Sequence, residues 1–239
     1  DFRRVCWNRW RDLSDARRQH VLNNISALLE KFENVDRLKT GAFGLFAVAG
    51  HRADFLFLQL RSTLKEIIDL ERALDCVGED LFVRSHSFVS VVELSDYTQD
   101  SSSELSAKQQ QAIQARLFPV LPATKYVCFY PMNKLRQQGS NWYLLPLQER
   151  QKLMKEHGMS GRKFAGRVTQ MISGAMGLDD WEWGVTLFAD NPVTFKQVVA
   201  TMRFDEVSAR YGEFGPFYVG NRIHVEQFLH LFDHEDSVA

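Results

Sequence analysis

The chain has 239 residues, of which 45% are hydrophobic and 25% charged, and its formal net charge is −1. This composition is that of an ordinary globular protein, long enough for one large domain or two of average size. The scattered charges exclude a basic nucleic-acid surface. No membrane-spanning run or signal peptide is recognisable, so we expect a cytoplasmic protein without membrane contact.

The three cysteines, Cys6, Cys76 and Cys128, lie far apart and form no CxxC pair. Their odd number and wide spacing argue against a disulfide framework and against a zinc site. We therefore expect three reduced thiols, each buried as a small hydrophobic side chain.

The sequence pattern of residues 1–95 predicts a first half that contains both strands and helices. The opening residues 1–3 resemble the end of a truncated strand. Ser14 is placed to cap the main part of the first helix. The apolar spacing predicts a helix over 7–32, strands over 40–49 and 54–61, a helix over 63–78 and a strand over 87–94.

The segment 96–123 is polar over its first part and contains three consecutive serines at 101–103. A stretch without apolar period is typical of a linker. We expect this linker to be followed by a short helix over 108–118, which carries Arg116.

Residues 124–239 repeat the element order of the first half. The pattern predicts a strand over 125–130, a helix over 146–157, strands over 168–176 and 181–189, a helix beginning at 191–192 and a strand over 217–223. Two such halves indicate an α+β fold of two ferredoxin-like βαββαβ repeats with packed antiparallel sheets, a dimeric α/β-barrel-like subunit. Two independent α+β domains joined by the serine linker are the alternative.

His157 lies where the second-half helix is expected to end, beside Gly158. As an imidazolium it would favour the helix dipole by about 0.3–1 kcal/mol. As a neutral imidazole it could be a single axial ligand of heme iron, whereas zinc would need further ligands that the spacing does not offer. No partner for its other ring nitrogen is identifiable. An unassisted imidazole would leave the iron less electron-rich than in a peroxidase.

Tyr130 is expected at the end of a strand, followed by Pro131 and then by Lys134. Most tyrosines in such places are amphipathic residues at the edge of a core. The functional interpretation is a redox-active phenol that loses an electron and a proton. Lys134 would ordinarily be solvated, and its closeness to Tyr130 is what makes it a candidate.

Arg203 is expected at the end of the last helix of the second half, and Ser208 follows it. Guanidinium and hydroxyl groups recognise carboxylates by hydrogen bonds, some of them charge-assisted. A salt-bridged surface is the alternative for the arginine.

Together these segments resemble the coproheme decarboxylases of the Firmicutes type, the heme-synthesising branch of the chlorite dismutase-like superfamily. The resemblance covers most of the chain and is strongest over 126–220. The matching segments are Tyr-Pro-Met-Asn-Lys at 130–134, and 141–146, 149–158, 181–185 and 202–211.

The resemblance implies a homopentamer that takes iron coproporphyrin III (coproheme) and hydrogen peroxide. Two propionates would be oxidatively decarboxylated to vinyl groups, which gives heme b, and the substrate would act as its own redox cofactor. A transient contact with coproporphyrin ferrochelatase is implied by the order of such a pathway.

The same resemblance assigns roles to residues. His157 would be the proximal iron ligand, Tyr130 the radical-forming residue, and Lys134 a residue that positions or protonates around the second propionate. Gln170 would occupy the distal position. The positions that would hold propionates are Arg116, Arg203 and Ser208.

Gln170 bears on the choice between branches. Chlorite-degrading relatives are expected to have an arginine there, and a glutamine supplies no charge to an anionic oxidant. The alternatives that remain open are a chlorite dismutase or peroxidase that uses heme b, and a non-enzymatic protein that binds or delivers heme.

Overall fold

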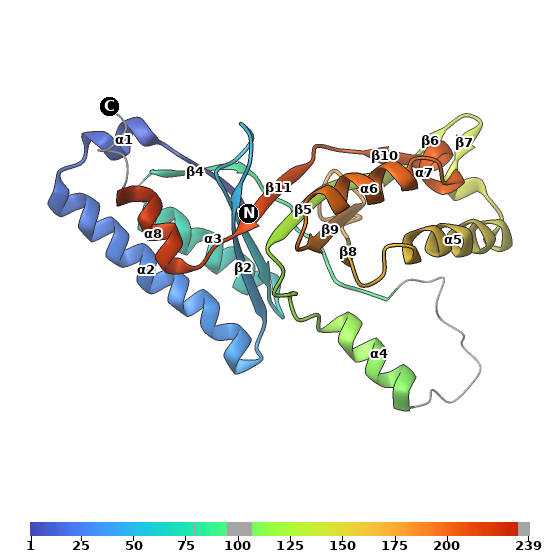
Figure 1. The fold of residues 1–239 in the computed structure, drawn as a ribbon, viewed down its shortest axis with the longest axis horizontal. Coiled ribbons are helices and arrows are strands. Elements are labelled where there is room, and N and C mark those ends of the chain that lie inside the picture. Colours follow the sequence, from blue (N-terminus) through green and yellow to red (C-terminus); the bar gives the residue numbers. More distant parts are fainter. Residues whose placement is uncertain (79, 95–106, 234–239) are drawn as a thin grey trace. The chain divides into compact units, whose positions relative to one another are not determined.

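The computed structural model describes residues 1–78, 80–94 and 107–233 and divides the chain into two compact units (Figure 1). The first unit contains residues 1–87 and the chain from Gly220 onward, and the second contains residues 88–219. The division therefore differs from the predicted boundaries at 95 and 124, because the C-terminal segment returns to the first unit. The predicted polar linker falls, up to residue 106, outside the described residues.

The first unit has the element order of a ferredoxin-like repeat. Its strands are antiparallel in the order β4-β1-β3-β2, and the last residues of β11 (Tyr218–Arg222) pair with β2. The order 4-1-3-2 is the one that the βαββαβ repeat produces. The elements are β1 (Phe2–Val5), α1 (Trp7–Asp12), α2 (Asp15–Leu38), β2 (Ala42–Val48), β3 (Phe55–Leu60), α3 (Leu64–Gly78), β4 (Phe82–His86) and α8 (Val225–Asp233).

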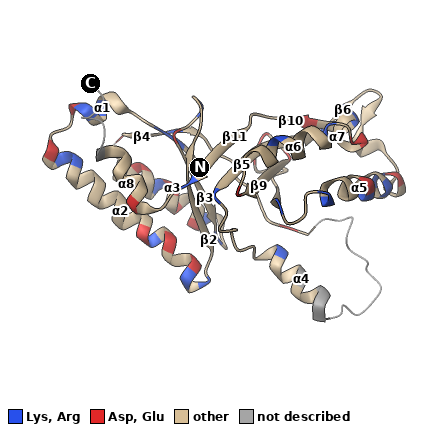
Figure 2. Ribbon diagram, in the orientation of Figure 1, with Lys and Arg blue, Asp and Glu red and all other residues tan. Residues whose placement is uncertain are grey.

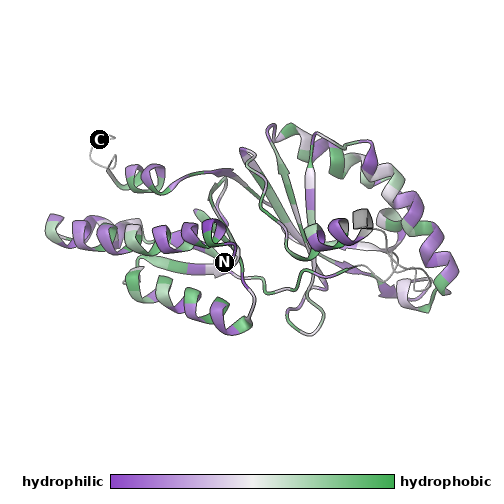
Figure 3. Ribbon diagram, turned by 90° about the horizontal axis from the view of Figure 1, so that it is seen from below, coloured by the Kyte–Doolittle hydropathy of each residue, from purple (hydrophilic) through white to green (hydrophobic). Residues whose placement is uncertain are grey.

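One face of this sheet packs on the helices through alternate residues of β2 and β3. The core contains Phe43 and Phe57 from the strands, Leu29 from α2 and Phe228 from α8. Each helix carries hydrophobic and hydrophilic residues on different sides, as the alternating colours in Figure 3 show, and charges of both signs are interspersed along α2 (Figure 2). Helix α8 was not predicted, although its aromatic residues complete this core.

Three predictions need correction here. The strand expected over 87–94 lies earlier, at β4, where three exposed central residues hide the strand pattern; over 87–94 the described residues form only an isolated bridge, Val91 with Gly174. The helix expected over 7–32 is two helices, because Ser14 caps α2 by accepting the Arg17 N–H, as predicted. All three cysteines are free, but only Cys128 is buried and Cys76 is exposed.

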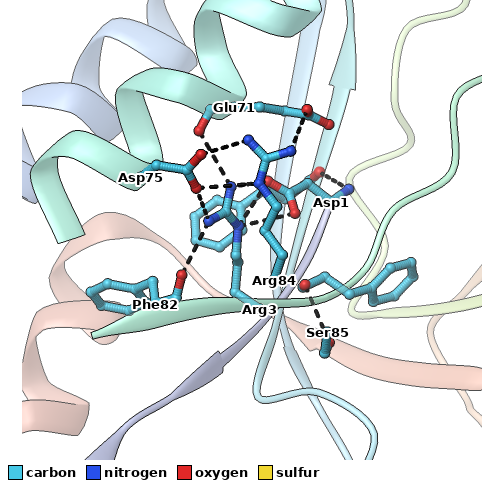
Figure 4. A network of polar contacts seen from close by, with 9 residues as sticks. Asp1, Arg3, Glu71, Asp75, Phe82, Arg84 and Ser85 are labelled. Atoms are coloured by element: carbon cyan, nitrogen blue, oxygen red, sulfur yellow. Dashed lines mark hydrogen bonds and ion pairs between the residues drawn. The ribbon is translucent and has the colours of Figure 1, made fainter. Parts of the chain in front are cut away.

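Arg3 is a fully buried arginine that ties β1 to α3 and β4 (Figure 4). Its guanidinium donates to the carboxylates of Asp1 and Asp75 and to the carbonyl oxygens of Phe82 and Glu71. Arg84 binds the same Asp75 carboxylate from the exposed side. A buried charge with this many partners is costly to lose, because removal of one member leaves the others unpaired inside the protein.

We expect Arg3→Met to lower the free energy of unfolding by about 3 kcal/mol, since the buried carboxylate of Asp1 and two carbonyl groups lose their donor. Arg84→Met is the matched control: its side chain is 40% exposed, and it should cost at most about 1 kcal/mol. Urea unfolding followed by circular dichroism measures both. Equal losses in the two variants would contradict the buried role of Arg3.

The second unit follows the same plan. Strands β5 (Tyr126–Lys134), β9 (Trp183–Ala189) and β8 (Thr169–Gly174) are antiparallel neighbours in that order, and β10 (Gly212–Phe214) pairs with β5 on its other side. Its helices are α4 (Ala107–Leu117), the 3-10 helix η2 (Trp142–Leu144), α5 (Leu147–Arg162), α6 (Val193–Met202) and α7 (Glu206–Tyr211). A small ribbon is formed by β6 (Arg136–Gln137) and β7 (Ser140–Asn141). The α+β class is confirmed.

Strand register places candidate residues of the second unit on one face of the sheet. Tyr130 lies opposite Val185, and Gln170 lies opposite Leu187, which in turn lies opposite Cys128. Directly opposite residues share a face, and so do residues two or four apart on one strand. Tyr130, Cys128, Lys134 and Gln170 therefore lie on the same face, which α6 covers in part through Phe195 and Val198.

Two predicted element ends in the second unit were wrong. Strand β5 does not stop at Tyr130 but continues to Lys134, because β9 and β10 pair with the residues beyond Pro131. Helix α5 does not close on Gly158 but continues to Arg162. Gly158 keeps a negative φ, and a helical glycine costs only about 1 kcal/mol, too little to end the helix.

Candidate functional site

His157 lies in the penultimate turn of α5 and contacts the start of α7. Its Nδ1 is 2.6 Å from Oδ2 of Asp205, whose side chain is only 5% exposed. An ionised carboxylate only accepts hydrogen bonds, so Nδ1 carries a proton, and in the neutral imidazole Nε2 then presents its lone pair. The pair has the geometry in which proteins hold a metal-binding imidazole.

Asp205 corrects the expectation that His157 is unassisted. The same carboxylate is the N-cap of α7, where it accepts the Ser208 N–H at 3.1 Å. A carboxylate partner raises the basicity of an imidazole and fixes its ring orientation. The sequence-based inference of a weakly donating histidine is therefore wrong in this respect.

A cleft of about 430 Å³ opens beside Asp205, between the ends of α5 and α6. Lys163 and Phe204 line it together with Asp205, and the ring of Phe204 is 92% exposed. The remaining lining residues are Ser160, Ala200 and Thr201. Solvent therefore lies close to the carboxylate end of the His157–Asp205 pair.

Tyr130 is buried in the core of the second unit, with 8% of its surface exposed. Its ring lies 4.6 Å from that of Phe217 and 6.0 Å from that of Phe214, centroid to centroid. Burial raises the pKa of the phenol, nearby Cys128 adds to this, and Arg203 opposes it. At neutral pH the hydroxyl keeps its proton, and over the described residues no hydrogen-bond partner of this hydroxyl is found.

Lys134 is a buried cation on the same face as Tyr130. Its Nζ lies 4.8 Å above the ring of Trp142, a cation–π geometry. Burial lowers the pKa of Lys134 to about 8, and the carboxylates of Asp205 and Glu182 oppose that shift. The ammonium can therefore exchange its proton near neutral pH, which a solvated lysine does not do.

In the sequence, Arg203 precedes Asp205 and Ser208 follows it. The guanidinium of Arg203 lies over the ring of Phe214, with Cζ 3.9 Å from the ring centroid. Ser208 is buried and holds Asp205 through its backbone N–H.

Gln170 and Arg116 are less closely connected to these groups. Gln170 is exposed on β8, the outer strand of the described part of this sheet, on the face that carries Tyr130. Arg116 is exposed near the end of α4. Between Arg116 and the other candidate residues the described structure shows no ion pair or hydrogen bond, so its role stays a prediction.

The geometry thus joins most of the candidate residues into two groups. His157, Asp205 and Ser208 form one, with Lys134 in the field of Asp205. Tyr130 and Arg203 form the other, since both contact the ring of Phe214. Sequence reasoning did not assign Asp205, Trp142 or Phe214. The one available signal was an aspartate followed by a glutamate, typical of a helix N-terminus.

The comparisons with known proteins identify the family of this chain. The family model described as "Chlorite dismutase" matches residues 8–223. The chain belongs to the chlorite dismutase family. Within the described residues, no helix of this family member has the length and hydropathy needed to cross a membrane.

Solved structures related to this chlorite dismutase family member include one described as a novel heme-binding protein from Thermus thermophilus. It is 44% identical, with a TM-score of 0.90, over 98% of this chain and 93% of that one. A chlorite dismutase from Candidatus Nitrospira defluvii in complex with imidazole is 17% identical, with a TM-score of 0.76, over 97% and 92% of the two chains. A mutant of that enzyme is 17% identical, with a TM-score of 0.77, over the same shares of the two chains. At such low identity these two show a shared fold.

Proposed function

We propose that this protein uses hydrogen peroxide to decarboxylate two propionates of iron coproporphyrin III to vinyl groups, which yields heme b. The observation that carries the proposal is the placement of Tyr130. Its phenol is buried and protonated, and its ring lies 6.0 Å from that of Phe214, over which the guanidinium of Arg203 lies. A hydrogen-donating phenol beside a carboxylate site is what oxidative attack on a propionate requires.

The residues present fit an iron porphyrin that carries carboxylates. His157 offers Nε2 as a single ligand and has a carboxylate behind it, as metal-binding histidines usually have. Arg203 and Lys134 supply the positive charge that propionates need, and Ser208 adds a hydroxyl. The bound iron would supply the oxidising power when peroxide reacts with it. The 44% identical relative, described as heme-binding, supports the same class of ligand.

The reaction balances with one peroxide for each propionate. The side chain loses carbon dioxide, one proton and two electrons, and hydrogen peroxide takes up two electrons and two protons to give two waters. We assign the hydrogen transfer to Tyr130, whose phenoxyl would take a hydrogen atom from the propionate β-carbon. Lys134, with a pKa of about 8, would return a proton or hold the second carboxylate.

Two alternative functions remain to be tested. Chlorite dismutation is disfavoured because Gln170, assigned to the distal position by resemblance, brings no positive charge to an anionic oxidant. Non-enzymatic heme binding is favoured by the description of the 44% identical relative. In that case Tyr130 would be a packing residue only.

One experiment separates the three functions. Ferric coproporphyrin III is mixed with the protein, hydrogen peroxide is titrated in, and the porphyrin is followed by mass spectrometry. Stepwise loss of two formic-acid equivalents of mass, with heme b as the end product, supports the proposal. Unchanged coproheme contradicts it, and rapid oxygen release from chlorite would indicate the dismutase instead.

The pKa of Lys134 leads to a prediction for substrate affinity. The folded-state pKa of about 8 lies below the ordinary value of 10.5, so the ammonium is fully present only below pH 8. If it holds a carboxylate, the affinity for metal-free coproporphyrin should fall above pH 8, by up to about tenfold for each pH unit over the first units. Fluorescence titration measures this. Lys134→Met should bind more weakly below pH 8 and lose that dependence, and an identical pH profile would contradict the role.

Three further assignments belong to the proposal. We include a homopentameric assembly, a cytoplasmic location and delivery of the substrate by a coproporphyrin ferrochelatase. Sedimentation of the porphyrin-loaded protein tests the assembly.

A further inference from the structure

Arg203 differs from three other arginines that lie over aromatic rings. Arg18 over Trp10 also donates to backbone carbonyls, Arg167 over Phe164 donates to Gln197, and Arg210 over Tyr211 pairs with Glu206. For the Arg203 guanidinium the described structure shows no carboxylate or carbonyl acceptor, and its contact with Phe214 is the shortest of these at 3.9 Å.

An aromatic ring is a special kind of support for a guanidinium. It attracts the cation through the face of the ring and restrains its plane, but it accepts none of the N–H groups in the usual way. The five donors of Arg203 therefore stay available to a ligand, which a salt bridge would not allow. The planar fork is suited to a carboxylate.

The ring of Phe214 is itself held in place. Phe214 lies on β10, opposite Met132 of β5, so its backbone is fixed two residues from Tyr130. Gly212 leaves room for the ring, since a Cβ there would lie 2.9 Å from two of its carbon atoms. The Tyr130 ring lies 6.0 Å from it, centroid to centroid. One aromatic side chain thus contacts both the guanidinium and the phenol.

We propose that Phe214 is a positioning residue that holds the Arg203 guanidinium so that it binds the carboxylate of the substrate side chain next to Tyr130. This assignment rests on the proposed function, because it takes the ligand to be a porphyrin with propionate groups. It adds a residue that the family resemblance did not assign. Phe214 acts through Arg203 and need not contact the carboxylate.

The experiment measures binding and does not depend on turnover. Metal-free coproporphyrin III is the probe, and quenching of tryptophan fluorescence gives its dissociation constant for the parent, Phe214→Leu, Arg203→Met and the double variant. We expect Phe214→Leu and Arg203→Met each to weaken binding about two- to fivefold, in the range of a cation–π contact of an exposed arginine. The double variant should bind no more than about twofold more weakly than Arg203→Met alone, because both changes remove one interaction.

Matched variants separate positioning from a general effect on packing. Phe214→Tyr keeps the ring and should bind within about twofold of the parent. Phe217→Leu alters the other ring beside Tyr130, and its effect should multiply with that of Arg203→Met. Arg210→Met, which removes a stacked arginine with its own carboxylate partner, should leave the affinity unchanged. Phe214→Met replaces the leucine variant if that one does not fold.

The outcomes are distinguishable. If the parent binds the porphyrin but Phe214→Leu binds equally well, or if the two effects multiply, the positioning role is overturned and the proposed function stands. If the parent binds no porphyrin, the proposed function fails and this assignment fails with it.

Discussion

Tyr130→Phe should stop the decarboxylation of coproheme while leaving its binding almost unchanged. The substitution removes one hydroxyl group from a buried ring, and the contacts with Phe214 and Phe217 are made by the ring. Loss of a group that takes part in the chemistry lowers rates by about a hundredfold or more. The affinity for ferric coproporphyrin should stay within about threefold of the parent. Mass spectrometry after peroxide addition and an absorbance titration give the two values.

Tyr126→Phe is the matched control for this prediction. Tyr126 lies on the same strand and the same face, four residues earlier, and packs against the same core. Its hydroxyl has no assigned part in the reaction, so heme b should form at the parent rate. Heme b formation at the parent rate by Tyr130→Phe would show that the radical site lies elsewhere and would return Tyr130 to a packing role.

The second large effect is expected from His157→Ala. The variant loses the proposed iron ligand but none of the groups that hold carboxylates. Binding of ferric coproporphyrin should weaken by about a hundredfold, whereas binding of metal-free coproporphyrin should change by less than about threefold. The ratio of the two dissociation constants isolates the iron–imidazole bond. Added imidazole should restore the absorbance spectrum of the parent complex.

His20→Ala serves as the control for His157. His20 is an exposed histidine on α2 in the first unit, where its ring contacts Asn24. Both dissociation constants should match those of the parent. Equal weakening of the iron-containing and metal-free porphyrins by His157→Ala would assign the histidine to the shape of the site and not to the metal.

Much of the fold could be predicted because hydrophobic periodicity depends on local sequence. Strands β2, β3 and β9 and helices α3 and α6 lie within a few residues of their predicted ends, and Ser14 caps α2 as expected. The pattern failed where local signals were weak. Strand β4 has a polar, exposed centre. Gly158 suggested a helix end, but α5 packs against α6 and α7 and continues past this glycine.

The candidate site could be predicted only in part. Tyr130 and Gln170 were expected on strands, but the extension of β5 to Lys134 and the register that places all three on one face depend on non-local strand pairing. The partner of His157 is Asp205, 48 residues away, and no spacing rule connects the two. Phe214 contacts Arg203 because β10 returns beside β5, and that pairing is visible only in three dimensions.

Asp205 makes two bonds with one oxygen atom, to the His157 ring and to the first turn of α7. Because the two bonds share this oxygen, thermodynamic linkage requires that each bond changes the free energy of the other by the same amount. A ligand on Nε2 makes the imidazole a better donor, and two donors on one oxygen compete for its electron density, so ligand occupancy weakens the bond to the first turn of α7. The amide of Ser208 should therefore exchange its hydrogen faster in the loaded protein, and its exchange rate reports whether the site is filled.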